Sequence, residues 1–128
     1  MEKMKKIKEP YKILIVDDED VFLQMIQIML NDKQYDVSIA HDGSEAVDLC
    51  FNNKFDLVLM DIMMPVMDGK TAAITIKKMS KNLPIVALTA FDVVQLEGME
   101  QFNYIIRKPI TKDALRKTIG DIIEKYRK

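Results

Sequence analysis

The segment "DLVLMDIMMPVMDG" (residues 56–69) runs from a stretch of apolar residues directly into an aspartate. The apolar residues 57–60 are typical of a buried strand, which would carry Asp61 at its carboxyl end. Burying a carboxylate is strongly unfavourable unless it is paired with a cation or hydrogen-bonded. Pro65 and the Asp68-Gly69 pair then predict a sharp turn. The segment therefore predicts a strand-end aspartate that needs a charged partner from elsewhere in the chain.

Short apolar runs alternate with longer segments of helical period along the chain. The expected strands are 12–16, 35–40, 56–60, 84–88 and 104–107, and the expected helices are 19–32, 44–54, 70–81 and 111–128, with a partly helical region at 91–103. Continuous rather than alternating apolar strands indicate burial on both faces, and the weaker run at 35–40 is expected nearer an edge. This order predicts an α/β fold, an open doubly wound parallel sheet of five strands with helices on both faces.

The spacing of apolar residues predicts which helix faces pack against the sheet. The expected inward faces are Phe22, Met25, Ile26, Met29 and Leu30 in the first helix, Ala46, Val47, Cys50 and Phe51 in the second, and Leu115, Ile119, Ile122 and Tyr126 in the last, with Thr111 as N-cap. Most of the ten methionines lie in such apolar segments, so we interpret them as residues that fill the core.

Composition narrows the class of protein. At 128 residues, 48% of them apolar and 30% charged, the chain is expected to form one globular domain. The net charge of −1 argues against nucleic-acid binding, and no apolar run is long enough for membrane insertion. Cys50 is the only cysteine, which favours a reducing compartment. We therefore expect a cytoplasmic protein with a flexible basic N-terminal arm at residues 1–10 and a single domain at 11–128.

Polar residues follow four of the five expected strands, at the end where open parallel sheets bind their ligands. They are Asp17 and Asp18 after the first strand, Asp61 after the third, Thr89 after the fourth and Lys108 after the fifth. Taken singly, each has an ordinary structural explanation, such as a helix cap or a turn. Their convergence on one edge favours a functional site. His41, after the second strand, is interpreted as a solvated loop residue.

Three clustered carboxylates would repel one another, and a hard divalent cation removes that conflict. An all-oxygen site with few protein ligands suits Mg²⁺. A lysine and a metal ion together make a pocket suited to a phosphoryl group, and Asp61 is the natural carboxylate nucleophile. The residues thus predict a site that holds a phosphoryl group temporarily, as an aspartyl phosphate.

Four motifs, "ILIVDDED", "LVLMDIMMPVMDG", "PIVALTA" and "RKPI", occur in this order and are together highly specific. By these motifs the chain resembles a response-regulator receiver domain of two-component signalling, over about residues 12–126. The resemblance implies a flavodoxin-like sheet with strand order 2-1-3-4-5. It also implies in-line phosphoryl transfer from the phosphohistidine of a histidine kinase or histidine phosphotransfer protein. Mg²⁺ would assist the transfer.

The resemblance assigns a metal role to four positions. Asp61 resembles the phospho-acceptor, which also binds Mg²⁺. Asp18 resembles the direct metal ligand, and Asp17 the one that acts largely through water. The backbone carbonyl of Met63 matches the position that completes the metal site.

The resemblance also assigns catalytic roles and a switch. Thr89 resembles the hydroxyl that closes on the phosphoryl group. Lys108 resembles the lysine that pairs with a phosphoryl oxygen, with a cis peptide expected before Pro109. Phosphorylation would shift a two-state equilibrium and so change the contacts with a downstream protein target. A homodimer is compatible with this reading.

Two departures from the family pattern concern signal readout. Ile105 stands where an aromatic is common, with Tyr104 one place earlier and so on the opposite face of the strand. The interval from Thr89 to Lys108 is also shorter than usual. Met63 and Phe91 resemble positions that influence phosphoryl lifetime in the family, and both are apolar, which predicts restricted access of water and no fast self-dephosphorylation.

Three other functions remain as alternatives. A degenerate receiver would keep the fold as a constitutive binding module, without phosphorylation. A phosphatase with an aspartyl nucleophile typically has a second aspartate two residues on, where this chain has Met63. A nucleotide-binding protein is disfavoured because no glycine-rich loop follows the first strand. The protein is thus expected to act as a switch and not as a turnover enzyme.

Overall fold

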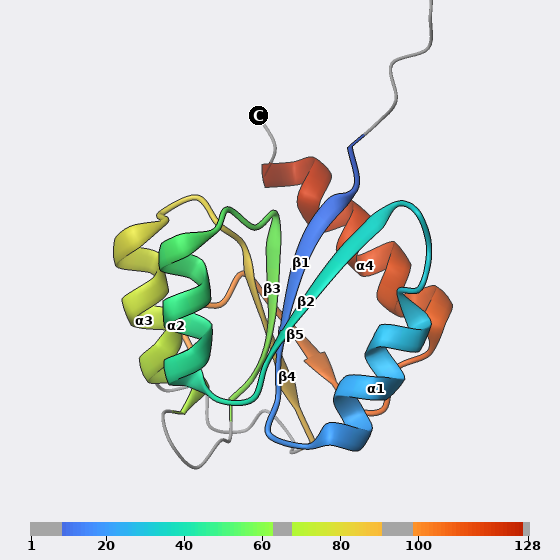
Figure 1. Cartoon of the computed structure of the whole chain (residues 1–128), viewed down its shortest axis with the longest axis horizontal. Coiled ribbons are helices and arrows are strands. Elements are labelled where there is room, and N and C mark those ends of the chain that lie inside the picture. Colours follow the sequence, from blue (N-terminus) through green and yellow to red (C-terminus); the bar gives the residue numbers. More distant parts are fainter. Residues whose placement is uncertain (1–8, 63–67, 91–98, 127–128) are drawn as a thin grey trace, which may run out of the picture.

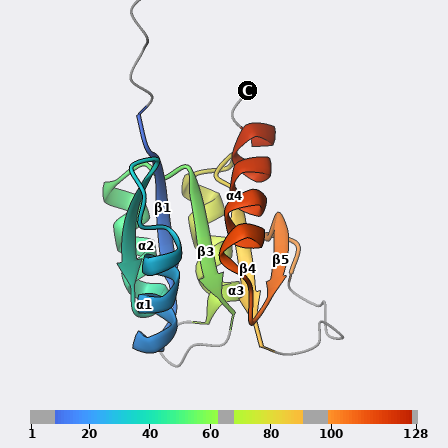
Figure 2. The same ribbon diagram turned by 90° about the vertical axis from the view of Figure 1, so that its right-hand side faces the viewer.

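The computed structural model describes residues 9–62, 68–90 and 99–126. Its elements are β1 (Tyr11–Val16), α1 (Asp20–Met29), β2 (Tyr35–Ala40), α2 (Gly43–Asn52), β3 (Leu57–Asp61), α3 (Gly69–Met79), β4 (Ile85–Thr89), β5 (Tyr104–Arg107) and α4 (Lys112–Tyr126). The five strands form one parallel sheet in the order β2-β1-β3-β4-β5, which confirms the expected topology. Helices α1 and α4 cover one face of the sheet and α2 and α3 the other (Figure 1; Figure 2).

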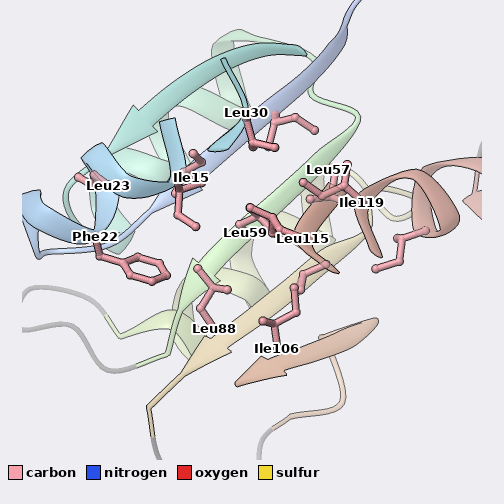
Figure 3. Packing of buried hydrophobic residues seen from close by; sticks show 14 of the residues in the cluster. Ile15, Phe22, Leu23, Leu30, Leu57, Leu59, Leu88, Ile106, Leu115 and Ile119 are labelled. Atoms are coloured by element: carbon pink, nitrogen blue, oxygen red, sulfur yellow. The ribbon is translucent and has the colours of Figure 1, made fainter. Parts of the chain in front are cut away.

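The core consists of two apolar layers separated by the sheet. Alternate residues of each central strand point to opposite faces, so Ile13 and Ile15 pack toward α1 and α4, whereas Leu14 and Val16 pack toward α2 and α3. Figure 3 shows the first of these layers, with side chains from the strands facing those of α1 and α4. Burial of each such side chain contributes roughly 1.5–3 kcal/mol. The continuous apolar runs in the sequence are explained by this burial on both faces.

The expected inward face of α2 is wrong at one residue. Ala46 and Cys50 are buried, but Phe51 is 75% exposed. Successive residues of an α-helix are rotated by about 100°, so the position after Cys50 already lies outside the arc that faces the sheet. Thr111 caps α4 as expected, because its hydroxyl accepts a hydrogen bond from the amide of Ala114 at 3.2 Å.

Two predictions fall largely outside the described residues. The expected N-terminal arm covers residues 1–10, of which 1–8 are not described. Of the partly helical region expected at 91–103, only residues 99–103 are described, and they form a turn and a bend. Among the residues that the structure describes, no helix has the length and apolar character needed to cross a bilayer.

The register of the sheet aligns the ends of the strands. Val16 lies beside Met60, so the residues that follow them, Asp17 and Asp61, emerge next to each other. Asp61 in turn pairs with Leu88, the residue before Thr89. The sheet thus brings residues from distant parts of the sequence to a single edge.

Candidate functional site at the carboxyl edge of the sheet

The buried polar side chains of the described part all lie at this edge. They are Asp17, Asp61 and Thr89, with exposed fractions of 0%, 7% and 2%. Every other residue buried to this degree is apolar or glycine within the described ranges. A polar residue is buried only where its environment compensates for the lost hydration. The concentration of all three at one edge marks the site.

Lys108 supplies the positive charge that the buried carboxylates require. Its ammonium lies 2.7 Å from Oδ2 of Asp17 and 3.7 Å from Oδ2 of Asp61. The Lys108 side chain is only 13% exposed, so its pairing with Asp17 is screened little by solvent. The partner that the opening segment required for Asp61 is therefore found, although the closest contact of Lys108 is with Asp17.

Asp17, Asp18 and Asp61 form a cluster of three carboxylates. One oxygen from each lies within 4.8 Å of the others, and Asp18 is the exposed member. Even with Lys108 nearby, three carboxylates leave an excess of negative charge. The all-oxygen donor set, open to solvent at Asp18, fits a hard divalent cation. Met63, the fourth expected metal ligand, lies outside the described residues.

Hydrogen bonds with the backbone fix the position of Asp17 in the carboxylate cluster. Its amide donates to the carbonyl of Ala40 at 3.1 Å, and its Oδ1 accepts from the amide of Glu19 at 2.9 Å. Glu19 is the N-cap of α1 and makes no side-chain capping bond. Asp17 is thus held by its own contacts with the backbone of Ala40 and Glu19, and it is not the N-cap residue of α1.

Gly69 allows the chain to return close to Asp61. Its amide donates to the carbonyl of Ile62 at 3.3 Å, and the neighbouring Asp68 caps α3 by accepting from the amide of Thr71 at 2.7 Å. A side chain at position 69 would overlap the carbonyl oxygen of Asp61 and lie 2.7 Å from Cα of Ile62. The sequence indicated a turn at Asp68-Gly69, but not that the glycine is required by close packing against the aspartate's backbone.

Thr89 and Lys108 are held side by side through their main chains. The carbonyl of Thr89 accepts a hydrogen bond from the amide of Lys108 at 2.8 Å. The Lys108-Pro109 peptide is cis, as the resemblance implied. Thr89 thus ends β4, and Lys108 directly follows β5, the neighbouring strand.

His41 lies at the margin of the site and is half-exposed, as expected for a loop histidine. Its ring nevertheless has partners: Nε2 lies 3.5 Å from Asp20, and Nδ1 lies 3.2 Å from Glu45. Tyr104 is also half-exposed. Phe91, the other apolar position linked to phosphoryl lifetime, lies outside the described residues.

The sequence matches the response regulator receiver domain family over residues 13–120. This chain belongs to that family. Response regulator receiver domains act in two-component signalling.

Similar proteins include both large sensors and single domains. The receiver domain is 37% identical over 117 residues to the autoinducer 1 sensor kinase/phosphatase LuxN of Vibrio harveyi, covering 88% of this chain but 14% of LuxN. Among solved structures, the chemotaxis protein CheY4 of Vibrio cholerae superposes with a TM-score of 0.82 at 31% identity, covering 88% of this chain and 98% of CheY4.

A third similar protein is described with a bound metal ion. The receiver domain of the sensor histidine kinase PA1611 of Pseudomonas aeruginosa, described with a magnesium ion coordinated in its active-site cleft, gives a TM-score of 0.83 at 29% identity. The match covers 90% of this chain and 98% of that domain.

Sequence reasoning missed three contributors to the site. Glu19 and Phe22, at the start of α1, approach the Lys108 ammonium at 3.8 Å and at 4.0 Å from the ring centroid. Gly69 is the third. Phe22 was expected in the core, where its ring does lie, but helical spacing carries no signal for a contact with a lysine on another element.

Proposed function

We propose that this receiver domain takes a phosphoryl group onto Asp61 from the phosphohistidine of a histidine kinase or histidine phosphotransfer protein. The observation that carries the proposal is the environment of Asp61. Its carboxylate is buried at a strand end, 3.7 Å from the ammonium of Lys108 and grouped with two further carboxylates. An isolated carboxylate would not be kept in such a place, whereas a phospho-acceptor needs this combination of charges.

Mg²⁺ is the proposed cofactor. Asp17, Asp18 and Asp61 would hold it, with the carbonyl of Met63 as the further ligand that the family resemblance implies. Their oxygen donors support this choice, as does the magnesium ion described for the similar PA1611 domain. When bound, Mg²⁺ supplies positive charge to the phosphoryl oxygens.

The transfer itself is a displacement at phosphorus. An oxygen of Asp61 attacks the phosphorus atom, the bond from phosphorus to the histidine nitrogen breaks, and its electron pair remains on the nitrogen. Lys108 neutralises charge on a phosphoryl oxygen as it develops. Thr89, one residue beyond the partner of Asp61 on β4, is suited to close on the bound phosphoryl group with its hydroxyl. Water later hydrolyses the acyl phosphate and resets the domain.

The proposed consequence is a change in protein contacts. The added phosphoryl charge biases a two-state equilibrium of the domain and so alters its affinity for a downstream protein. The domain catalyses only its own phosphorylation and dephosphorylation in this scheme. Cytoplasmic location and action without nucleic-acid binding are parts of the same proposal, and a homodimer is compatible with it. The similar LuxN is much longer than this chain, and the match covers 14% of it. We therefore propose the class of phosphodonor and of target, and not individual proteins.

The test is the intact mass of the protein after incubation with Mg²⁺ and acetyl phosphate. Wild type is expected to gain one phosphoryl group, and the gain should vanish in Asp61→Asn and in the presence of a chelator. Asp48→Asn, a change at an exposed helix residue, is the matched control and should behave as wild type. If wild type gains no phosphoryl group under any condition, the degenerate binding module replaces the proposal.

A further inference from the structure

Lys108 has an aromatic partner that the proposed chemistry has not used. Its ammonium lies 4.0 Å from the centroid of the Phe22 ring, well within the distance of about 6 Å at which a cation is attracted by the face of an aromatic ring. The same ammonium lies 2.7 Å from Asp17. The ammonium nitrogen of Lys108 is thus held by the ring of Phe22 and by the carboxylate of Asp17.

The Phe22 ring lies where it can do this. Phe22 belongs to α1 and is 8% exposed, as part of the apolar layer between the sheet and helices α1 and α4. In Figure 3 its ring stands at the end of that layer nearest the carboxyl ends of the strands. A leucine would also be an apolar residue at this position, although a smaller one. What only an aromatic residue adds is the negative face of its ring, directed at the lysine.

The ring differs from the other neighbours of Lys108 in one respect. Asp17 and Asp61 are both candidate metal ligands and phosphoryl neighbours, so their charge is engaged during the reaction. Glu19, at 3.8 Å, is 69% exposed, and exposed ion pairs contribute little. Among the neighbours that the structure describes, Phe22 offers the ammonium a contact with an uncharged side chain, which can stay in place while the ammonium exchanges one anionic partner for another.

We infer that Phe22 is a positioning residue for Lys108. The ring keeps the ammonium of Lys108 at the site while this ammonium exchanges its contact with Asp17 for one with the phosphoryl group on Asp61. This inference rests on the proposed function, because it assigns Phe22 a part in the same phosphoryl transfer. Phe22 touches neither the phosphoryl group nor the metal ligands in this scheme, and it acts through Lys108.

The experiment compares variants that keep the size of the ring but change its charge distribution. Site-specific replacement of Phe22 by monofluorinated, difluorinated and trifluorinated phenylalanine weakens the negative ring face step by step with little change in volume. The rate constant of phosphorylation by acetyl phosphate at saturating Mg²⁺ is expected to fall in the same order. Phe22→Leu should be about tenfold slower than wild type, equivalent to about 1.4 kcal/mol in the barrier.

Two further variants separate electrostatics from packing. Phe22→Tyr keeps an aromatic face and should retain a rate within about twofold of wild type. Phe51→Leu makes the same change at an exposed position and is the matched control, with no change expected. Urea unfolding of each variant shows whether a slow rate merely follows lost stability, because the fluorinated series should unfold like wild type.

A second readout needs neither metal nor phosphodonor. Protons held over an aromatic face resonate upfield, so the side-chain ε-methylene signals of Lys108 should show this shift by NMR in wild type and Phe22→Tyr. The shift should disappear in Phe22→Leu. This measurement reports the contact itself in the resting protein.

The outcomes separate this inference from the proposed function. If wild type is phosphorylated but the fluorinated series and Phe22→Leu match its rate within twofold, the ring only packs and the inference is wrong. Absence of the upfield shift in wild type would equally overturn it. If wild type accepts no phosphoryl group at all, the proposed function fails first, and the role of Phe22 in the transfer fails with it.

Discussion

Replacing Asp61 by asparagine is expected to stabilise the protein when no divalent cation is present. In the cluster, Asp61 lies within 4.8 Å of the carboxylates of Asp17 and Asp18 and 3.7 Å from the ammonium of Lys108. At an effective dielectric constant of about 20, each repulsion amounts to about 3.5 kcal/mol and the attraction to about 4.5 kcal/mol. The two repulsions together exceed the single attraction by about 2.5 kcal/mol.

Two further effects adjust this value. Asp18 is exposed, so its repulsion is screened and the gain shrinks. Asp61 is buried, so neutralising it also removes a desolvation penalty, which restores part of the gain. Lys108 is not left unpaired, since Asp17 remains at 2.7 Å. We therefore expect Asp61→Asn to raise the free energy of unfolding by about 1–2 kcal/mol.

Urea unfolding in a chelator measures this difference. With a urea dependence of about 2 kcal/mol per molar, in the middle of the usual range, the midpoint of the variant should lie about 0.5–1 M above that of wild type. Mg²⁺ should then narrow or reverse the difference, because a cation at one hundred times its dissociation constant stabilises the folded wild type by about 2.7 kcal/mol. A variant that unfolds at lower urea than wild type in chelator would refute the claim that carboxylate repulsion dominates the resting site.

The remaining predictions concern glycine packing, the buried thiol of Cys50 and the partly buried ammonium of Lys77. Gly69→Ala should destabilise the protein by about 1–3 kcal/mol and slow phosphorylation, because its methyl group overlaps the backbone of Asp61. Gly120→Ala, in α4 with open space around it, should instead stabilise by about 0.5–1 kcal/mol, and urea unfolding distinguishes the two. Burial raises the pKa of the Cys50 thiol to about 11, so a thiol reagent at mildly alkaline pH should label native protein only as fast as it unfolds; rapid labelling would contradict the burial. The stability gained from the neutral thiol should be present below the pKa of an ordinary cysteine and be lost as the pH rises toward 11, a dependence absent in Cys50→Ala. Burial lowers the pKa of Lys77 in the folded protein. At pH values just below the ordinary lysine pKa, the unfolded chain therefore binds more protons at this residue than the folded protein does, and the free energy of unfolding should rise with pH. This pH dependence should be absent in Lys77→Met.

Much of the fold follows from the sequence because its determinants are local. The three central strands, β1, β3 and β4, contain continuous apolar runs, and the four described helices carry apolar residues at helical spacing. Burial on one or both faces could therefore be inferred from neighbours in the chain. Errors arose where the exact rotation of a helix matters. Phe51 lies at the edge of the apolar arc of α2, and only the packed position of the helix turns it to solvent.

The set of candidate site residues also follows from the sequence. A parallel sheet gathers the carboxyl ends of its strands at one edge, so Asp17, Asp61, Thr89 and Lys108 could be grouped without coordinates. Their roles still rest on the family resemblance and on the experiments above. Residues without a polar side chain, such as Gly69 and Phe22, gave no comparable signal, because their contribution depends on what packs against them.

The sequence by itself determined that a carboxylate at the end of β3 would have partners, and which residue types they would be. Tertiary structure alone decided how those partners are shared. The ammonium of Lys108 makes its closest contact with Asp17, 91 positions away in the chain, and it also lies over the ring of Phe22. The physical reason is that strand register and helix packing set distances between elements to within an ångström. Periodicity and composition carry information only about the element in which a residue stands.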